Sequence, residues 1–269
     1  MGADWLPSNI PLDKPSVARM YDYFLGGAHN FAIDRQAADH VIAACPEFPL
    51  AMRANRGFLR RAVRYLLTRG VEQFLDVGSG IPTVGNVHEV AQRMNAAARV
   101  VYVDMDPVAV AHSQAILQGN PQTAIVEADA RRPEQFLDHP DTQRLLDNGQ
   151  PVGLVLVAML HFVTNDEAAY DLVHRVIAAL PSGSFLVLSH ATTEGVPLEL
   201  CNRLEQLYKG TTDPVIMRPR AAVERFFNGL ELMEPGVVYT PLWHPEGPED
   251  VLLEQPELSL ALAGVARKA

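Results

Sequence analysis

Acidic residues and glycines stand together at three places along the middle of the chain, each directly after a short apolar run. The segments are Asp76-Val77-Gly78-Ser79-Gly80, Asp104-Met105-Asp106 and Glu127-Ala128-Asp129-Ala130. Gly78 and Gly80 permit a tight turn and a close approach of a ligand to the backbone, because no Cβ stands in the way. Asp104 suits the two hydroxyls of a ribose, since a carboxylate only accepts hydrogen bonds, and Asp129 can accept one from an exocyclic amine. In this order the segments predict a nucleoside ligand.

The same segments favour one class of nucleoside over another. A dinucleotide site has a third glycine, in Gly-x-Gly-x-x-Gly, beside the pyrophosphate, and this chain has Thr83 there. Asp76 would repel a pyrophosphate but suits a ligand with a positively charged end. S-adenosylmethionine carries an ammonium and a sulfonium group and no phosphate, so it is the ligand that we expect. A nicotinamide-dependent oxidoreductase is the less favoured alternative, because the chain also lacks a Tyr-x-x-x-Lys pair.

Short apolar runs alternate with helical patterns from residue 71 onward. Strands are expected at 73–77, 100–103, 124–127, 152–157 and 185–188, and helices at 85–98, 107–117, 134–147 and 167–180. Runs this short and this continuously apolar are typical of strands buried on both faces of a parallel sheet. Further helices near 197–208 and 219–227 and a hairpin of strands near 231–239 and 258–266 are expected to follow. The alternation predicts a doubly wound α/β sheet, with its ligand site outside the carboxyl ends of the strands.

The first part of the chain has a different texture, which predicts three helices over residues 15–69. The first is expected to begin at Pro15, a residue suited to the first helical position, and the second to have Asp34 as its N-cap. We therefore expect a helical cap over residues 1–70 and a Rossmann-like domain over residues 71–269. The two are expected to pack as one unit.

Segment 19–34 of this cap is unusually polar and glycine-rich for a packing helix and its turn. We interpret it as a lid that forms part of the acceptor pocket, because lids exclude water and complete a site on closure. Its candidate residues are Arg19, Tyr21, Tyr23, Gly26, Gly27 and Asn30. In the alternative interpretation the two tyrosines only pack against the sheet domain, and the two glycines only end the first helix.

The three acidic and glycine-containing segments resemble, in order, motifs I, II and III of the class I S-adenosylmethionine-dependent methyltransferases. More narrowly, the chain resembles an actinobacterial S-adenosyl methyltransferase family long catalogued as a domain of unknown function. The segments that carry this resemblance are ARMYDYFLGG (18–27), NFAIDR (30–35), NRGFLRRAV (55–63), QFLDVGSG (73–80), PTVGNVH (82–88), LHF (160–162) and SHA (189–191). One departure is Pro82, at a position where class I loops often have a third glycine.

The resemblance implies a sheet of seven strands with the last antiparallel, S-adenosylmethionine as cofactor and S-adenosylhomocysteine (SAH) as product. The residues that would bind the cofactor are Asp76, Gly78, Ser79, Gly80, Asp104, Met105, Asp129, Ala130, Ala158 and Met159. Within this set, the resemblance places Asp104 on the ribose, Met105 against the adenine, and Asp129 at the adenine edge. Ala158 and Met159 would face the sulfonium.

Methyl transfer is an SN2 displacement, so the enzyme mostly aligns the nucleophile with the methyl group and sometimes removes a proton. His161 follows the fourth predicted strand and His190 follows the fifth, on the ligand side of the sheet. A histidine titrates near neutral pH, so both are candidate bases, with His161 preferred. The alternative for each is a histidine that only hydrogen-bonds a neighbouring backbone group.

The sequence also narrows the class of acceptor. Segment 158–162 reads AMLHF, which is not the Asp/Asn-Pro-Pro-aromatic motif of amino-methylating DNA enzymes. Neither Cys45 nor Cys201 follows a proline, as the nucleophile of carbon-5 pyrimidine enzymes does. A small-molecule acceptor, with secondary metabolism as one setting, is therefore favoured. A cofactor-binding protein without catalysis, acting as a sensor or partner subunit, is the alternative from another class.

Composition and charge narrow the partners and the cellular location that we expect. The 269-residue chain has a formal net charge of −10, which argues against a nucleic-acid partner. Its arginine run at 53–69 is expected to be the solvated face of a helix, with a local anion site as the alternative. Two cysteines are too few for a cysteine-based metal site, and no metal is expected. The longest apolar run is half a membrane span and no export signal is visible at the start, so a cytoplasmic protein without membrane contact is expected. The sequence specifies neither the acceptor nor the oligomeric state.

Overall fold

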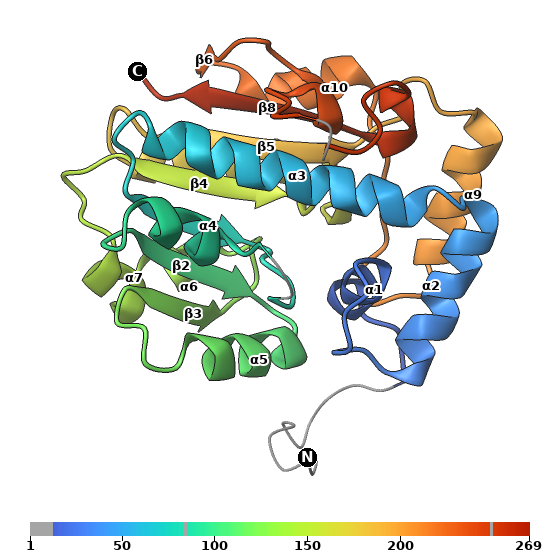
Figure 1. The fold of residues 1–269 in the computed structure, drawn as a ribbon, viewed down its shortest axis with the longest axis horizontal. Coiled ribbons are helices and arrows are strands. Elements are labelled where there is room, and N and C mark those ends of the chain that lie inside the picture. The colour runs from blue at the N-terminus through green and yellow to red at the C-terminus, as the bar shows by residue number, and fades with distance from the viewer. Residues whose placement is uncertain (1–12, 83–84, 248–249) are drawn as a thin grey trace.

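The computed structural model describes residues 13–82, 85–247 and 250–269, so Thr83 lies outside the described residues. The strands are β1 (Gln73–Val77), β2 (Arg99–Asp104), β3 (Thr123–Glu127), β4 (Val152–Val157), β5 (Phe185–Ala191), β6 (Glu231–Leu232), β7 (Val238–Tyr239) and β8 (Ala261–Arg267). They form a sheet in the order β3-β2-β1-β4-β5-β8-β6, with β7 paired to β8 (Figure 1). Strands β1 to β5 are parallel and β8 is antiparallel to β5. The predicted Rossmann-like α/β sheet with an antiparallel last strand is confirmed.

The predicted number of seven strands is wrong, because the described residues form eight. The strand expected at 231–239 is two short strands, β6 and β7, each antiparallel to β8. Pro235 and Gly236 stand between them, and a proline has no N–H to donate to a sheet ladder. The five parallel strands lie where the apolar runs placed them.

The helices are α1 (Val17–Phe24), α2 (Ala32–Ala44), α3 (Phe48–Leu67), α4 (Val87–Met94), α5 (Pro107–Leu117), α6 (Pro133–Leu137), α7 (Pro140–Leu145), α8 (Asp166–Ala179), α9 (Leu198–Tyr208) and α10 (Arg220–Glu224). The single helix expected at 134–147 is two helices, because Pro140 cannot continue a helix but can start one. Helix α1 begins at Val17 rather than Pro15, with Ser16 as its N-cap. Asp34 is not the N-cap of α2, because the helix begins two residues earlier.

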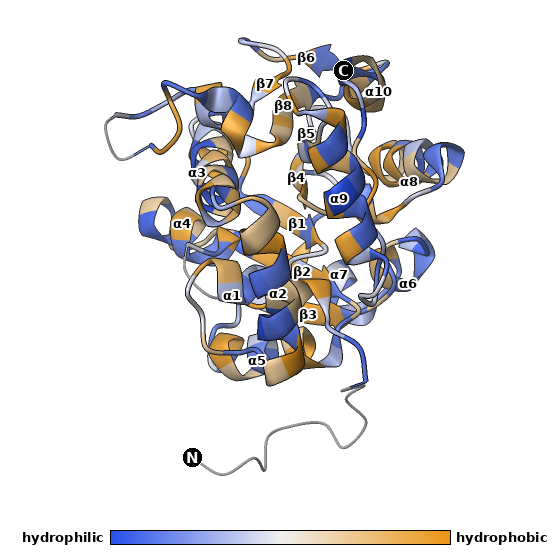
Figure 2. Ribbon diagram, turned by 90° about the vertical axis from the view of Figure 1, so that its right-hand side faces the viewer, coloured by the Kyte–Doolittle hydropathy of each residue, from blue (hydrophilic) through white to orange (hydrophobic). Residues whose placement is uncertain are grey.

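The core lies on both faces of the sheet. Leu75, Leu154 and Leu186 belong to the apolar cluster that includes α8, and Phe74 and Val155 belong to the cluster that includes α3 and α4. Figure 2 shows α3 and α4 on one side of the strands and α6 and α8 on the other. Because neighbouring residues of one strand enter opposite clusters, the strands are apolar throughout rather than alternating.

A third apolar cluster lies beyond the carboxyl ends of the strands. There α1 and α2 pack with α9, through residues such as Met20, Val41 and Leu204. In Figure 1 these helices stand beyond the arrowheads of β2, β3 and β4, while α3 starts among them and runs back across the sheet. The helices of the N-terminal part therefore reach the edge of the sheet at which a parallel α/β fold binds its ligand.

Candidate functional site

A cavity of about 320 Å³ lies between the carboxyl ends of the strands and helices α1, α3 and α9. This volume falls within the range of roughly 300–1,000 Å³ that small-molecule sites occupy. Every residue predicted to bind the cofactor lines it: Asp76, Gly78, Ser79, Gly80, Asp104, Met105, Asp129, Ala130, Ala158 and Met159. Both candidate bases, His161 and His190, line it as well. Residues from the ends of five strands thus converge on one cavity.

The glycine loop after β1 is held against the end of β2. Gly78 donates its N–H to the Val103 carbonyl at 2.8 Å, and Gly80 donates its N–H to Asp104 Oδ2 at 2.7 Å. Gly78 has a φ of +73°, and a Cβ built there would lie 2.2 Å from Cγ of Met159. Only glycine fits this position, which leaves its backbone open to the cavity.

Asp104 and Asp76 are the buried carboxylates of the site. Asp104 accepts N–H groups at both oxygens, from Gly80 and, at 2.8 Å, from Asp106, and each oxygen keeps a lone pair for a ligand hydroxyl. Burial raises the pKa of Asp104 to about 6 and that of Asp76 to about 7. The Arg56 guanidinium opposes the rise in the pKa of Asp76, and Arg56 also lines the cavity.

The third carboxylate, Asp129, forms a two-pronged pair with Arg131. Arg131 Nε lies 2.8 Å from Oδ1 and its Nη2 lies 2.8 Å from Oδ2. Hydrogen bonds from Arg131 lower the pKa of Asp129, so this carboxylate is ionised near neutral pH. Met105, an apolar side chain that is 48% exposed, lines the same end of the cavity as a surface on which a flat ring can pack.

The two histidines are held by neighbouring polar groups. His190 Nδ1 lies 2.7 Å from the Ala191 carbonyl and its Nε2 lies 2.6 Å from Arg218 Nη1, so the neutral ring donates at Nδ1 and accepts at Nε2. Burial lowers the pKa of His190 to about 3. His161 Nδ1 accepts the Ala191 N–H at 3.4 Å, and burial lowers its pKa well below the usual range. Both rings are therefore neutral, with one or both nitrogens already hydrogen-bonded.

Of the predicted lid residues, only Tyr21 lines the cavity. Arg19 is fully buried, and Tyr23 points to Asp39 through a hydrogen bond of 3.0 Å. Asn30, Gly26 and Gly27 belong to a turn away from the cavity; Asn30 Nδ2 donates to Asp22 at 2.8 Å, and a Cβ on Gly27 would strike the same carboxylate. These five residues lie in α1 or in the turn after it, and they do not line the cavity.

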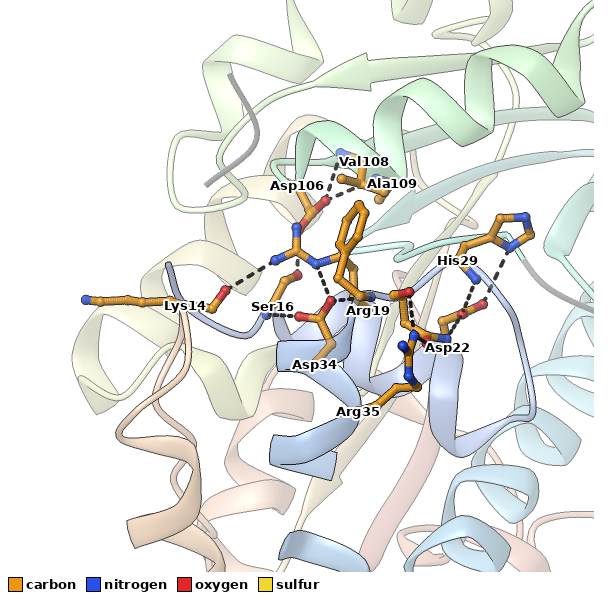
Figure 3. Close-up of polar contacts among 12 residues, drawn as sticks. Lys14, Ser16, Arg19, Asp22, His29, Asp34, Arg35, Asp106, Val108 and Ala109 are labelled. Carbon is orange, nitrogen blue, oxygen red and sulfur yellow. Dashed lines mark hydrogen bonds and ion pairs between the residues drawn. The ribbon is translucent and has the colours of Figure 1, made fainter. Parts of the chain in front are cut away.

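Arg19 ties this N-terminal segment to the strand end that carries Asp104. Its Nε lies 2.9 Å from Asp34 Oδ2, and its Nη1 lies 3.7 Å from Asp106 Oδ2 (Figure 3). Ser16 donates its hydroxyl to Asp106 and its N–H to Asp34. Asp106 in turn caps α5, accepting the N–H of Val108 at 2.8 Å. The elements α1, α2 and α5 therefore meet in one buried ionic network.

The arginine run at 53–69 is not simply a solvated helix face. Arg61 is buried, donates to the carbonyls of Trp243 and Thr240 at 2.8 Å each, and pairs with Asp250. Arg56, one turn and a half before it, reaches the cavity instead. The sequence reasoning gave Arg56 only as part of a possible local anion site, and it missed Asn55 and Tyr208, which also line the cavity.

In the part of the chain that the structure describes, no three His, Cys, Asp or Glu side chains gather closely enough to hold a metal ion. Nor does any helix of those residues have the length and apolar character needed to cross a membrane.

The chain is similar in sequence and in fold to known proteins. The profile of a family described as S-adenosyl methyltransferase matches residues 3–269. The chain is similar to the crystal structure of a candidate methyltransferase from Thermobifida fusca, with 40% identity and a TM-score of 0.90 over 99% of both chains. It is also similar to a DUF574 family protein from Streptomyces avermitilis, with 40% identity and a TM-score of 0.92 over 97% of this chain and 100% of that one.

A more distant likeness concerns the fold alone. The magnesium protoporphyrin IX methyltransferase of Synechocystis, solved with bound SAH, is 15% identical, with a TM-score of 0.53 over 93% of each chain. A search of curated proteins gave no match.

Proposed function

The chain belongs to the S-adenosyl methyltransferase family, and on that premise we propose that it transfers a methyl group from S-adenosylmethionine to a small-molecule acceptor. One observation carries this proposal. Three carboxylates from neighbouring strands, Asp76 in β1, Asp104 at the end of β2 and Asp129 just after β3, line one cavity with a glycine loop. An all-carboxylate set suits a ligand with an ammonium group, a ribose diol and an exocyclic amine, and it suits a pyrophosphate poorly.

We assign the cofactor-binding roles on this basis. Asp76 holds the ammonium group, and Arg56, beside it, holds the carboxylate of the methionine end. Asp104 accepts from the ribose hydroxyls, and Asp129 accepts from the adenine amine with the lone pairs that Arg131 leaves open. Arg56 in this role corresponds to the local anion site that the arginine run left as its alternative interpretation.

The residues around the sulfonium position align the reactants. S-adenosylmethionine supplies an electrophilic methyl group on a positively charged sulfur. Gly78 and Met159 are packed against one another there, and Ala158 is held by an N–H bond to Ser189 Oγ at 3.0 Å. Enclosure between the strand ends and α1 excludes water and fixes the direction of approach, which is most of what an SN2 displacement requires.

A small molecule fits the acceptor side better than a macromolecule. The cavity is enclosed by side chains of α1, α3 and α9, so an acceptor has to enter it to reach the methyl group. The net charge of −10 also works against a polyanionic acceptor such as nucleic acid.

Calorimetric titration with S-adenosylmethionine and, separately, with NAD tests the proposal. We expect micromolar binding of the methyl donor and none of NAD. Asp104→Ala should weaken the methyl donor at least roughly tenfold, because both ribose hydroxyls lose a charged acceptor. Asp171→Ala, which removes an exposed carboxylate on α8, is the matched control and should bind as the wild type does. Preference for NAD, or full affinity in Asp104→Ala, would overturn the proposal.

A cofactor-binding sensor without catalysis is the second candidate, and the histidines favour it. In each ring the nitrogen that carries the lone pair already accepts a hydrogen bond, and burial lowers the pKa, so neither is set up as a general base. Incubating the protein and S-adenosylmethionine with a small-molecule cell extract separates the two. Formation of SAH above the rate of an Asp104→Ala sample supports the enzyme, and binding without SAH formation supports the sensor.

A further inference from the structure

The cavity has a second wall, opposite the strand ends, that the cofactor-binding residues do not use. We call it the apolar wall; it consists of Phe48, Met52, Phe162, Leu204, Val215 and Met217. These side chains come from α3, the turn at Leu160–Phe162, α9 and the segment after it, and all belong to the third apolar cluster. An acceptor seated between the methyl group and this wall would bury its own surface against carbon and sulfur atoms.

The two guanidinium groups that line the cavity, among the described residues, already have carboxylate neighbours. Arg56 faces Asp76, where its positive charge opposes the rise in the pKa of that carboxyl. Arg131 pairs with Asp129, and the charge of Asp213 also helps to raise the pKa of its guanidinium. An anionic acceptor would therefore lose its hydration without gaining an unused guanidinium, and that loss is costly in a buried site. A protonated amine, in turn, has no lone pair with which to attack the methyl group.

Two tyrosines, Tyr21 and Tyr208, line the same cavity. Tyr21 Oη accepts Asn55 Nδ2–H at 2.9 Å and donates to the Met52 carbonyl at 3.4 Å, so one of its lone pairs stays open. Asn55 cannot turn its amide around, since its Oδ1 accepts the Ser189 hydroxyl at 2.6 Å. Tyr208 is 7% exposed, lines the cavity, and has no hydrogen-bond partner for its hydroxyl among the described residues.

The hydrogen-bond chain from the strand ends sets the position of Tyr21. It runs from the Ala158 N–H to Ser189, from Ser189 to Asn55, and from Asn55 to Tyr21. The same chain thus connects the backbone beside the sulfonium position with the hydroxyl on the acceptor side. An acceptor that donates a hydrogen bond to Tyr21 is thereby placed relative to the methyl group.

Resting on the function proposed above, we propose that the acceptor is an uncharged, largely apolar small molecule with a hydroxyl or a neutral amine. Its X–H group donates to Tyr21 Oη, and its apolar frame packs on the apolar wall. In the transfer the X–CH₃ bond forms as the methyl–sulfur bond breaks and the sulfur keeps that electron pair. The proton of X passes to bulk water when the methylated product leaves the cavity. Tyr21 is a positioning and recognition residue in this step, not a base.

Calorimetry on the full chain saturated with SAH tests the acceptor class with one ring system. The probes are 2-naphthol, 2-naphthylamine, naphthalene and 2-naphthoate. We expect the naphthol or the naphthylamine to bind about threefold to tenfold more tightly than naphthalene, through the bond to Tyr21. We expect 2-naphthoate to bind at least about tenfold more weakly than the neutral probes. Tighter binding of 2-naphthol indicates a hydroxyl acceptor, and tighter binding of 2-naphthylamine indicates an amine acceptor.

A variant of Tyr21 shows whether its hydroxyl gives this selectivity. Tyr21→Phe should remove the preference for 2-naphthol or 2-naphthylamine over naphthalene and leave SAH affinity within about twofold, and Tyr170→Phe on α8 is the matched control. Equal or tighter binding of 2-naphthoate, no binding of any neutral probe to the SAH complex, or an unchanged preference in Tyr21→Phe would each overturn the inference. Failure to bind SAH at all would instead count against the proposed function, so the two failures are distinct.

Discussion

Two opposing effects act on the ionisation of the buried Asp76 carboxyl group. Burial raises its pKa to about 7, while the Arg56 guanidinium favours the ionised form. An ammonium ligand would favour the ionised form further, so the pKa of Asp76 should fall when the cofactor binds. Cofactor binding is therefore linked to the release of a proton below pH 7. Above pH 7 Asp76 is already ionised, so binding releases almost no proton from it.

This linkage predicts a pH-dependent affinity. Between pH 8 and pH 6 the affinity for SAH should fall about tenfold, because Asp76 must lose the proton that it carries below its pKa of about 7. Calorimetry at several pH values measures the slope. Asp76→Asn should bind weakly at every pH with a flatter profile, and Asp171→Asn should keep the wild-type slope. A wild-type affinity that does not change from pH 8 to pH 6 would contradict the assignment.

Weaker binding at pH 6 would not reflect a less stable fold. The folded-state pKa of Asp76 lies above its usual value of 3.8, so the folded protein binds more protons than the unfolded chain between those values. The contribution of this group to the free energy of unfolding therefore decreases as the pH rises through that window. Affinity and the stability contribution of Asp76 change in opposite directions.

Gly78 offers a test of backbone geometry. In Gly78→Ala the new Cβ would have to displace the Met159 side chain at the sulfonium position, so we expect loss of cofactor affinity of tenfold or more, on the order of 1.4 kcal/mol. Gly70→Ala is the matched control, because it has the same sign of φ, +79°, but open space around its Cβ position. Both variants should lose roughly 1 kcal/mol of stability from the left-handed backbone. Equal SAH affinity in the two, measured by calorimetry, would argue against a close approach at Gly78.

At the scale of elements, the network around Arg19 should stabilise the junction of α1, α2 and α5. Arg19→Met leaves the Asp34 carboxylate buried without its guanidinium, so the free energy of unfolding should fall by about 3–5 kcal/mol. Chemical denaturation measures this loss. Arg144→Met, which breaks an exposed pair on α7, should cost less than about 1 kcal/mol. The double variant Arg19→Met/Asp34→Asn should lose less than the sum of the two single losses, and strict additivity would contradict the pairing.

The helices and strands could be predicted where the local sequence alone determines them. Each parallel strand is mostly apolar because it is covered on both faces, and the ends of β1, β2 and β3 carry the acidic or glycine residues that line the cavity. Pro140 divides a predicted helix, and Pro235 divides a predicted strand. Both effects follow from the N–H group that proline lacks. Asn55 and Tyr208 could not be found in this way. Asn55 and Tyr208 lie more than 150 residues apart, and only tertiary packing brings α3 and α9 to the same cavity.

At the scale of the whole molecule, α3 connects the two predicted regions. It begins with Phe48 in the third apolar cluster and ends on the sheet, where Phe58, Ala62 and Leu66 are fully buried. Its Arg61 pairs with Asp250, near the other end of the sequence. Removing α3 would expose one face of the sheet, whereas removing α1 and α2 would expose only the cluster beyond the strand ends.

Two truncations therefore test the division at residue 70. Residues 71–269 lack α3, and we expect them to show no cooperative unfolding transition, because the sheet face that contains Phe74 and Val155 loses its cover. Residues 47–269 keep α3 and every residue assigned to the cofactor, so they should unfold cooperatively, at lower denaturant than the full chain. They should bind SAH more weakly, because α1 no longer encloses the cavity. Circular dichroism during urea unfolding distinguishes these cases. A cooperative transition for 71–269 would make that segment a domain able to fold alone, and residues 1–70 a separate cap. Its absence, with cooperative unfolding of 47–269, would assign α3 to the sheet domain and confine the movable part of the cap to α1 and α2.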